Sequence, residues 1–314
     1  MSALSESERK IILVTRRTRL QELVARYNTV EQARFQAEHL GMDFSDFQDE
    51  DRTYQTAVGV VDACLARHGR LQRLDRSFLP NFLFPPDCLV VTLGQDGLVA
   101  NTLKYLKQQP LLAINPDPAR WDGVLLPFAA ADLPKVMTEV LRDRRAIREV
   151  TMARARLSDG QQLLAVNDIF VGARSHVSAR YEIDLADRHE RQSSSGVIVS
   201  TGLGSTGWLR SVLTGASAVA EGHLLPELKN LRDKGLGWDA KRLFFSVREP
   251  FPSKSTQATL VFGRIESPAP LRIRSLMPEG GIIFSDGIEA DGLEFRSGLE
   301  AVIDVAEQRG RLLH

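Results

Sequence analysis

Three short polar stretches of this sequence carry the residue types that bind phosphates and sugar hydroxyls. The first is 193–207, SSSGVIVSTGLGSTG, in which an apolar run ends in a loop of Gly, Ser and Thr. Glycines allow positive φ angles and a close approach of the backbone to a ligand, and the hydroxyl groups donate hydrogen bonds. This combination indicates an anion site, and a phosphate is the anion that we expect there.

The residues that follow this loop strengthen the case for an anion site. Trp208–Leu213 has a helical pattern, so the loop would direct backbone N–H groups and the N-terminus of a helix toward negative charge. The same stretch also fits a Gly/Ser turn that joins a buried strand to a helix. The residue types alone leave both interpretations open.

The second and third polar stretches each contain a carboxylate. LGQDG, at 93–97, follows the apolar run Cys88–Leu93, and a carboxylate at Asp96 can accept a proton from a hydroxyl group. Aspartate is also a favoured cap, so Asp96 equally fits a cap on a helix that starts near Leu98. Asn167 and Asp168 follow another apolar run, and they also fit a turn inside a β hairpin.

The first third of the chain predicts a parallel sheet, because strand and helix signals alternate there. We expect strands at Ile11–Val14, Cys88–Leu93 and Leu111–Ile114, and helices from Leu20 to Gly41, around Val61–His68, over Leu98–Gln108 and from Leu133 to Leu141. Ligands of such sheets bind beyond the carboxyl ends of the strands, where the loops 94–97 and 115–118 would lie.

Beyond Ile147 the apolar period changes to two, which predicts short strands separated by turns. We expect strands at Val150–Leu157, Leu163–Val171, Ser178–Leu185, Val197–Ser200, Arg242–Arg248, Ala258–Phe262, Leu271–Ser275, Ile282–Phe284 and Leu299–Val305. One helix, Trp208–Ala220, interrupts them, and the stretch from there to Trp238 looks like a loop. Asp286-Gly287 and Asp291-Gly292 are expected turns.

The predicted architecture is therefore an α/β N-terminal domain with a parallel sheet, followed by a mostly antiparallel β C-terminal domain. We place the domains at 1–135 and 136–314, and we expect the last residues to pack back on the first domain. A chain of this length can build two such cores.

Composition restricts the class of protein. Of the 314 residues, 43% are hydrophobic and 25% charged, and no apolar run approaches a membrane span. Lys plus Arg equals Asp plus Glu at 40 each, so no global field favours binding to nucleic acid. Cys64 and Cys88 lie in apolar runs and fit a reducing compartment. The start, MSALSESERK, shows no targeting pattern, so we expect a cytoplasmic protein.

Taken together and in this order, the three polar stretches resemble the NAD kinase family, whose members carry GGDGT, an Asn-Glu pair and a Gly/Ser/Thr loop. The similarity is closest to the mitochondrial type. It rests on NDIFVGARSHVSARYEI and RQSSSGVIVSTGLGSTGW, with LLAINPDP at 111–118 and FSVREP at 245–250 in support. The resemblance runs from about Lys10 to near the C-terminus and implies a shared fold more strongly than a shared activity.

The resemblance implies an ATP- and Mg²⁺-dependent transfer of a phosphoryl group to NAD, which gives NADP, in a homodimer or larger homo-oligomer. Asp96 would accept the proton of the 2′-hydroxyl of the adenosine ribose, while Asn167 would read the base and Asp168 the sugar diol. The implied phosphate-binding residues are Gly94, Gln95, Gly97, Thr201, Gly202 and Gly204. The implied NAD-binding residues are Asp96, Gly97, Asn167, Asp168, Ser205, Thr206, Gly207 and Trp208, and no residue is expected to bind a metal directly. Asp96 and the loop after Ser200 would then act on one dinucleotide, across a cleft between the two halves.

Two residues depart from the GGDGT motif. Gln95 replaces its second glycine and Leu98 replaces its threonine, which removes a hydroxyl donor. If that glycine has a positive φ, Gln95 is strained by about 1–2 kcal/mol. These changes leave two further hypotheses, a catalytically impaired NAD-binding relative and a kinase for another hydroxyl substrate such as a sugar. Asp168 also differs from the Glu of the family, so it must approach a sugar more closely.

Overall fold

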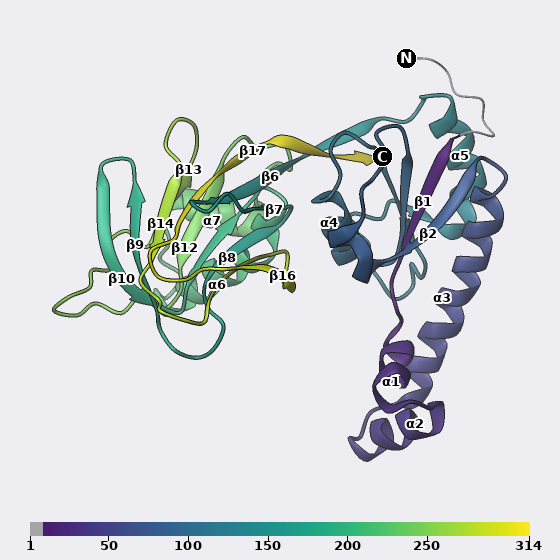
Figure 1. Ribbon diagram of the computed structural model, residues 1–314, viewed down its shortest axis with the longest axis horizontal. Coiled ribbons are helices and arrows are strands. Elements are labelled where there is room, and N and C mark those ends of the chain that lie inside the picture. The colour runs from purple at the N-terminus through teal and green to yellow at the C-terminus, as the bar shows by residue number, and fades with distance from the viewer. Residues whose placement is uncertain (1–8) are drawn as a thin grey trace. The chain divides into compact units, whose positions relative to one another are not determined.

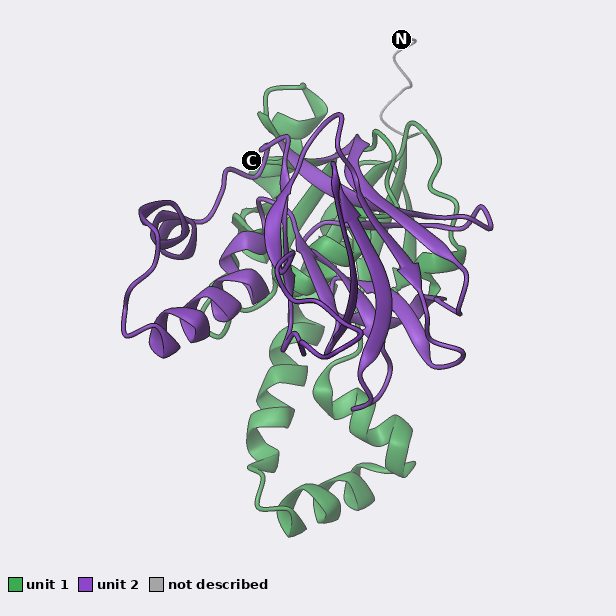
Figure 2. Ribbon diagram, turned by 90° about the vertical axis from the view of Figure 1, so that its left-hand side faces the viewer, with its two compact units in different colours: residues 1–148, 311–314 green, residues 149–310 purple. Residues whose placement is uncertain are grey.

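The computed structural model describes residues 9–314, so the first eight residues, on which the expectation about targeting rests, lie outside the described part. The chain divides into unit 1, which contains the residues up to 148 together with 311–314, and unit 2, which contains 149–310 (Figure 2). This division differs from the expected boundary at 135/136, which would cut the helix α5, Leu133–Leu141. The helix stays whole in unit 1 because its apolar side chains belong to the core of that unit.

Unit 1 is built on a parallel sheet with the strand order β2–β1–β3–β4. Its strands are β1 (Lys10–Thr15), β2 (Arg70–Asp75), β3 (Leu89–Leu93), β4 (Leu111–Asn115) and β5 (Phe128–Ala129), and its helices are α1 (Arg19–Tyr27), α2 (Val30–His39), α3 (Phe44–Leu65), α4 (Asp96–Leu103) and α5. Beside β4 lies the end of the chain, where Leu312 pairs with Leu111. The predicted α/β fold with a parallel sheet is confirmed.

The strands β1, β3 and β4 of unit 1 are covered on both faces, which explains why they read as continuous apolar runs, whereas the edge strand β2 is mostly polar and exposed. Every residue of β3 and β4 is buried. Alternate residues of the strands, such as Leu13 and Val91, pack with α3 and α5 in one hydrophobic core. Their neighbours Ile12 and Val90 point to the opposite face and are equally inaccessible.

Helices α1, α2 and the first half of α3 form a helical lobe at the far end of α3 (Figure 1). Their own small core contains Ala33, Ala37, Phe44 and Phe47. We expected one helix from Leu20 to Gly41, but the chain breaks at Asn28, which has a φ of 70°. Thr29 then caps α2 by accepting the N–H of Gln32 at 3.2 Å. Asparagine in the left-handed region followed by a capping threonine is a helix-restart signal that hydrophobic periodicity does not reveal.

A buried carboxylate on α3 ties this lobe to the sheet. Glu50 is 3% exposed and forms ion pairs with Arg16, at 2.9 Å, and with Arg19, just after the end of β1. Burial alone would raise the pKa of Glu50, but the hydrogen bonds from Arg19 and Arg16 outweigh it and hold that pKa below its usual value. Arg19 also reaches Asp46 at 2.7 Å.

Unit 2 contains two sheets. The first has the order β10–β9–β14–β17, with β6 beside β17 and β7 beside β6, and the second has the order β13–β12–β11–β8–β15–β16. The neighbouring strands of the second sheet are antiparallel, as predicted for the C-terminal domain. Side chains of both sheets, including Tyr181, Val199, Phe245 and Ile273, form one hydrophobic core.

Unit 2 consists mainly of short strands, with two helices between β11 and β12, and its first and last strands, β6 and β17, extend a few residues into unit 1. Its elements are β6 (Ile147–Leu157), β7 (Gln162–Ala165), β8 (Asp168–Ala173), β9 (Ala179–Leu185), β10 (Arg188–Ser194), β11 (Val197–Ser200), α6 (Trp208–Val219), α7 (Pro226–Lys234), β12 (Leu243–Val247), β13 (Phe262–Ile265), β14 (Leu271–Ser275), β15 (Gly281–Ser285), β16 (Ile288–Glu294) and β17 (Glu300–Leu313). Within residues 9–314, none of the helices combines the length and the apolar character that a bilayer crossing requires.

Several elements of unit 2 differ from the sequence-based expectation. The stretch before Trp238 was expected to be a loop, yet it contains α7, which begins with Pro226 at its first turn. The expected strand Leu163–Val171 is interrupted after Ala165 and resumes at Asp168. Asp291-Gly292 lies inside β16 and not in a turn. The polar strand β10 was also missed.

We predict that Glu50→Gln lowers the free energy of unfolding of the protein by about 3 kcal/mol, because it leaves the guanidinium groups of Arg16 and Arg19 without their shared counter-charge. Urea denaturation of the full chain at neutral pH measures this loss. Asp49→Asn is the matched control, since Asp49 pairs with Arg52 on the exposed side of the same helix and such pairs contribute about 0–1 kcal/mol. Equal stability of the two variants would contradict the prediction.

Candidate functional site

Unit 2 brings together three segments that are far apart in the sequence: the bend at 166–167, the loop after β11, and the turn between β15 and β16. Thr201 connects the first two, since its N–H donates to the carbonyl of Asn167 at 2.9 Å and its hydroxyl donates to the carbonyl of Val166 at 2.5 Å. The carboxylate of Asp286, in the third segment, accepts the N–H of Asn167 at 2.6 Å. The structure therefore places the Asn-Asp pair directly beside the Gly/Ser/Thr loop.

Gly202 and Gly204 are needed for close packing and not for positive φ angles, which corrects the expectation that the loop glycines take positive φ. Gly202, Gly204 and Gly207 are absent from the glycines with positive φ. A Cβ atom on Gly204 would lie 2.2 Å from the carbonyl oxygen of Asn167, and one on Gly202 would lie 2.0 Å from the carbonyl oxygen of Gly237. Both positions thus exclude a side chain because the backbone of another segment lies against them.

Asp168 is the carboxylate of this site with an unused bonding position. Its Oδ1 is buried and has no hydrogen-bond partner among the described residues. Burial raises the pKa of Asp168 to about 7; the hydroxyl of Ser200 opposes this shift and the charge of Asp286 adds to it. A buried, unpartnered oxygen is costly, and a ligand hydroxyl would satisfy it.

Most hydroxyl groups of the loop are used inside the protein. Ser205 is fully buried; its hydroxyl donates to the carbonyl of Gly202 at 2.6 Å and accepts the N–H of Leu236 at 2.8 Å. The hydroxyl of Thr206 donates to the carbonyl of Leu203 at 3.2 Å. Thr206 and Gly207 are exposed at the start of α6, so they are the expected ligand-binding residues of the loop that solvent reaches.

Trp208 packs within its own unit. Its ring stacks on Phe170 at a centroid distance of 5.8 Å and an interplanar angle of 15°, and the guanidinium carbon of Arg248 lies 5.5 Å from the ring centroid. Phe170 in turn contacts Phe284 at 4.9 Å. Because these neighbours already contact the half-buried indole, a base would contact Trp208 only at its remaining accessible edge.

In unit 1 the LGQDG stretch forms the turn between β3 and α4. Gly94 is buried, and a Cβ on it would lie 2.7 Å from Cδ2 of Leu98. The carbonyl of Leu93 accepts the hydroxyl of Tyr54 at 2.9 Å. Gln95 precedes the helix with φ −105° and ψ 168°, so the strain that a positive φ would impose on Gln95 does not arise.

Asp96 is the first residue of α4 and not its N-cap, contrary to the capping alternative. Its Oδ1 accepts the N–H of Leu125 at 2.7 Å, and its Oδ2 accepts the N–H of Val124 at 3.3 Å. These donors belong to the connector 116–127, whose fold depends on Asn115: the side-chain N–H of Asn115 donates to the carbonyl of Trp121 at 3.0 Å. No sequence pattern predicted this contact between the connector and Asp96.

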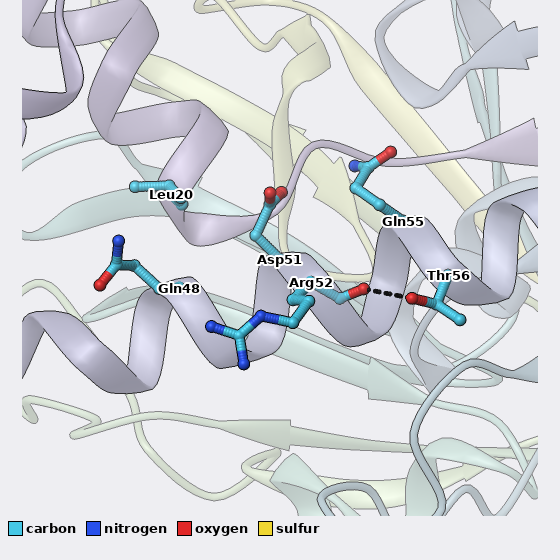
Figure 3. A pocket seen from close by; sticks show the side chains of 6 residues that line it. All are labelled: Leu20, Gln48, Asp51, Arg52, Gln55 and Thr56. Atoms are coloured by element: carbon cyan, nitrogen blue, oxygen red, sulfur yellow. Dashed lines mark hydrogen bonds between the residues drawn. The ribbon is translucent and has the colours of Figure 1, made fainter.

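A surface depression lies on unit 1, and it is not formed by the predicted site residues. This depression of about 570 Å³ is lined by Leu20, Gln48, Asp51, Arg52, Gln55 and Thr56, and Figure 3 shows these side chains along α3 and the start of α1. Within residues 9–314, no group of three or more His, Cys, Asp or Glu side chains is placed to hold a metal ion.

We predict that Gly204→Ala lowers the free energy of unfolding by about 2 kcal/mol or more, because the added methyl group overlaps the backbone at Asn167. Gly215→Ala in α6 is the control, since a Cβ there has no neighbour within 4 Å and should raise helix stability by about 0.5–1 kcal/mol. Thermal denaturation distinguishes the two. A Gly204→Ala protein as stable as the wild type would show that the loop does not pack against the bend.

Asp168→Asn should stabilise the protein at high pH. Because the pKa of Asp168 is raised to about 7, the native state favours the protonated carboxyl group, and this stabilisation is lost as the pH rises from about 4 through 7. The variant should therefore gain on the order of 3 kcal/mol over the wild type at pH 8 and progressively less at lower pH. Denaturation at pH 5 and pH 8 measures the difference, with Asp187→Asn on the exposed β9–β10 turn as the control. A gain that is independent of pH would contradict the prediction.

Comparison with known proteins identifies the fold. The sequence matches no protein-family model and no curated protein. The structure is similar to yeast NADH kinase complexed with NADH, with a TM-score of 0.55 and 15% identity over 98% of this chain and 84% of that chain. It is also similar to an NAD kinase from Archaeoglobus fulgidus in complex with ATP, with a TM-score of 0.57 and 16% identity over 97% and 93% of the two chains. The resemblance to NAD kinases is thereby confirmed for the fold.

Proposed function

We propose that this protein is an NAD kinase-like phosphotransferase that transfers the γ-phosphoryl group of ATP to the 2′-hydroxyl of the adenosine ribose of NAD, giving NADP and ADP. The fold supports this assignment, because the two similar structures are of kinases complexed with NADH and with ATP. The observation that carries the proposal is the buried, unpartnered Oδ1 of Asp168 beside the Gly/Ser/Thr loop.

Unit 2 supplies the binding site for the adenosine end of NAD in this proposal. Asp168 accepts a ribose hydroxyl at Oδ1. This oxygen fits beside residue 204 because Gly204 has no Cβ atom, which would lie 2.8 Å from it. Asn167 presents a side-chain amide, with both donors and an acceptor, to the base. Thr206, Gly207 and Trp208 line the dinucleotide next to them. Thr201, Gly202, Ser205 and Gly204 shape the loop through their internal bonds and close contacts.

Asp96 is the proposed general base. As the new bond forms between O2′ and the γ-phosphorus and the bond from that phosphorus to the β,γ-bridging oxygen breaks, the proton of the 2′-hydroxyl passes to the Asp96 carboxylate. The N–H groups of Val124 and Leu125 each use one acceptor position of this carboxylate. Two oxygens offer about four positions, so acceptance of a hydroxyl proton is compatible with these bonds, which also fix the orientation of the carboxylate.

The donor phosphates would bind at the turn between β3 and α4. Gly94, Gln95 and Gly97 lie at the carboxyl end of a parallel strand and at the N-terminus of α4, where backbone N–H groups favour anions. Mg²⁺ would enter on the phosphates of ATP, since Mg²⁺ commonly binds substrate phosphates with few protein ligands. Leu98 is 2% exposed, so its side chain fills space above Gly94 and offers no donor to the phosphates.

We predict that Asp96→Asn lowers kcat for NADP formation by on the order of 10²–10⁴ while the affinity for NAD changes little. A coupled assay for NADP with ATP or polyphosphate as donor measures kcat, and calorimetry measures NAD binding. Asp122→Asn, an exposed residue of the same connector, is the matched control.

Two results would count against the proposed activity. Full activity of Asp96→Asn would remove the general base from the mechanism. A wild-type protein that binds NAD but forms no NADP, and that gains activity when Gln95→Gly is combined with Leu98→Thr, would instead identify a non-catalytic NAD-binding relative.

From the family resemblance we also propose that the protein contributes to NADP biosynthesis in the cytoplasm and works as a homodimer or larger homo-oligomer. The balanced charge of the chain is compatible with a small-molecule substrate and with no role in binding nucleic acid. Sedimentation of the purified protein tests the oligomeric state.

A further inference from the structure

We propose that Asp286 is a positioning residue of the NAD site: its carboxylate fixes the bend between β7 and β8 and thereby orients Asn167 and Asp168 toward the adenosine end of NAD. This inference rests on the proposed function for the identity of the ligand. Its structural part, the control of the bend by one side chain, stands on hydrogen bonds within unit 2.

The carboxylate of Asp286 accepts the N–H groups of three consecutive residues. Its Oδ1 lies 3.1 Å from the nitrogen of Val166, 2.6 Å from that of Asn167 and 3.2 Å from that of Asp168, and its Oδ2 lies 3.0 Å from the nitrogen of Val166. Val166 and Asn167 lie between two strands, outside the sheet ladders. Buried N–H groups there need an acceptor, and Asp286 provides it.

The bend is held from its other side by the Gly/Ser/Thr loop. The carbonyls of Val166 and Asn167 accept the hydroxyl and the N–H of Thr201. Asp286 therefore accepts hydrogen bonds from the N–H groups of the bend, while Thr201 donates hydrogen bonds to its carbonyl groups. With both sets fixed, β8 starts in register with β11, with Asp168 opposite Ser200, and the side chains of Asn167 and Asp168 keep one direction.

A simpler role for Asp286 is that of a turn former. Asp286 and Gly287 have φ values of 54° and 72°, and such two-residue hairpins favour Asp-Gly because both residues take positive φ. That role requires only the backbone conformation, which Gly or Asn also supports. The β9–β10 hairpin shows the difference, because Ala186, whose own side chain has no carboxylate, takes a φ of 53° there. The three N–H bonds are thus additional to what the turn needs.

The experiment compares Asp286→Gly and Asp286→Asn with Ala186→Gly in the full-length protein. The first two keep the turn, but Gly removes the acceptor and Asn retains one neutral oxygen, while Ala186→Gly relaxes a left-handed residue in a hairpin outside the site. Hydrogen exchange followed by mass spectrometry reports the amides of 166–168 without any ligand. Calorimetry measures the affinity of each variant for NAD.

We expect Asp286→Gly to speed exchange at 166–168 by about tenfold or more, with β11 and β12 unchanged, and to weaken NAD binding by a similar factor. Asp286→Asn should retain part of the exchange protection and part of the NAD affinity, and Ala186→Gly should match the wild type in both. Unchanged exchange and affinity in Asp286→Gly would overturn the inference. If the wild type binds no NAD, the proposed function fails, and the exchange result still decides whether Asp286 fixes the bend.

A pH profile separates this role from a general loss of structure. Besides burial, the groups that act on Asp168 are the hydroxyl of Ser200 from β11 and the charge of Asp286 from the turn. NAD binding that needs the ionised carboxylate should weaken as the pH falls through about 7 in the wild type. In Asp286→Asn the midpoint should move to lower pH, because a neighbouring negative charge is gone. An unshifted midpoint would contradict the placement of the Asp286 charge beside the Asp168 carboxylate, on which this inference depends.

Discussion

Buried backbone N–H groups that do not bond within a sheet require another acceptor. In the bend between β7 and β8, that acceptor is a side chain more than a hundred residues further along the chain. Asp286 accepts the N–H groups of Val166, Asn167 and Asp168. The neighbouring features follow from this arrangement. Thr201 bonds to the carbonyls of the bend, and position 204 cannot bear a side chain because the carbonyl of Asn167 lies against it. Asp168 then lies in a place where one of its oxygens is buried and unused.

Carboxylates that accept backbone N–H groups recur elsewhere in the chain. Asp96 accepts two from the connector of unit 1. Glu190 accepts those of Thr259 and Leu260, and although burial opposes ionisation, these bonds and those of the Thr259 hydroxyl and Gln192 hold its pKa at about 2. Accepting a backbone bond is therefore no sign of catalysis in this protein. Asp168 differs from Asp96 and Glu190 in that one of its buried oxygens has no donor among the described residues.

Much of the fold could be predicted from the sequence because strands such as β3 and β4 of unit 1 are continuous apolar runs, and because strands of unit 2 either alternate, as β14 does, or are short apolar runs, as β11 is. The predictions failed where polar chemistry decides the structure. β10 has buried Glu190, Gln192 and Ser194 in its interior, and these pair with one another and with Tyr181, so no apolar alternation marks it. The restart at Asn28 and the helix after Pro226 depend on single residues of turn and cap chemistry.

The candidate site shows a similar limit. The sequence identified Asn167, Asp168 and the loop after Ser200, and the resemblance to a family joined them into one site. Their spatial convergence comes from the antiparallel register of β8 with β11 and β15, which no local pattern encodes. The glycines illustrate the point, because the sequence does not distinguish a glycine that avoids a steric clash from one that needs a positive φ. Only the contact with Asn167 decides the case of Gly204.

The membership of residues 311–314 in unit 1 has a consequence for biosynthesis. Leu313 belongs to the hydrophobic core of unit 1, and Leu312 pairs with β4, so unit 1 is completed only by residues that follow the whole of unit 2 in the sequence. Domains made during translation generally fold in order from the N-terminus. Here the whole of unit 2 must be synthesised before Leu312 can pair with Leu111 of β4, and until then that part of β4 can pair with other molecules.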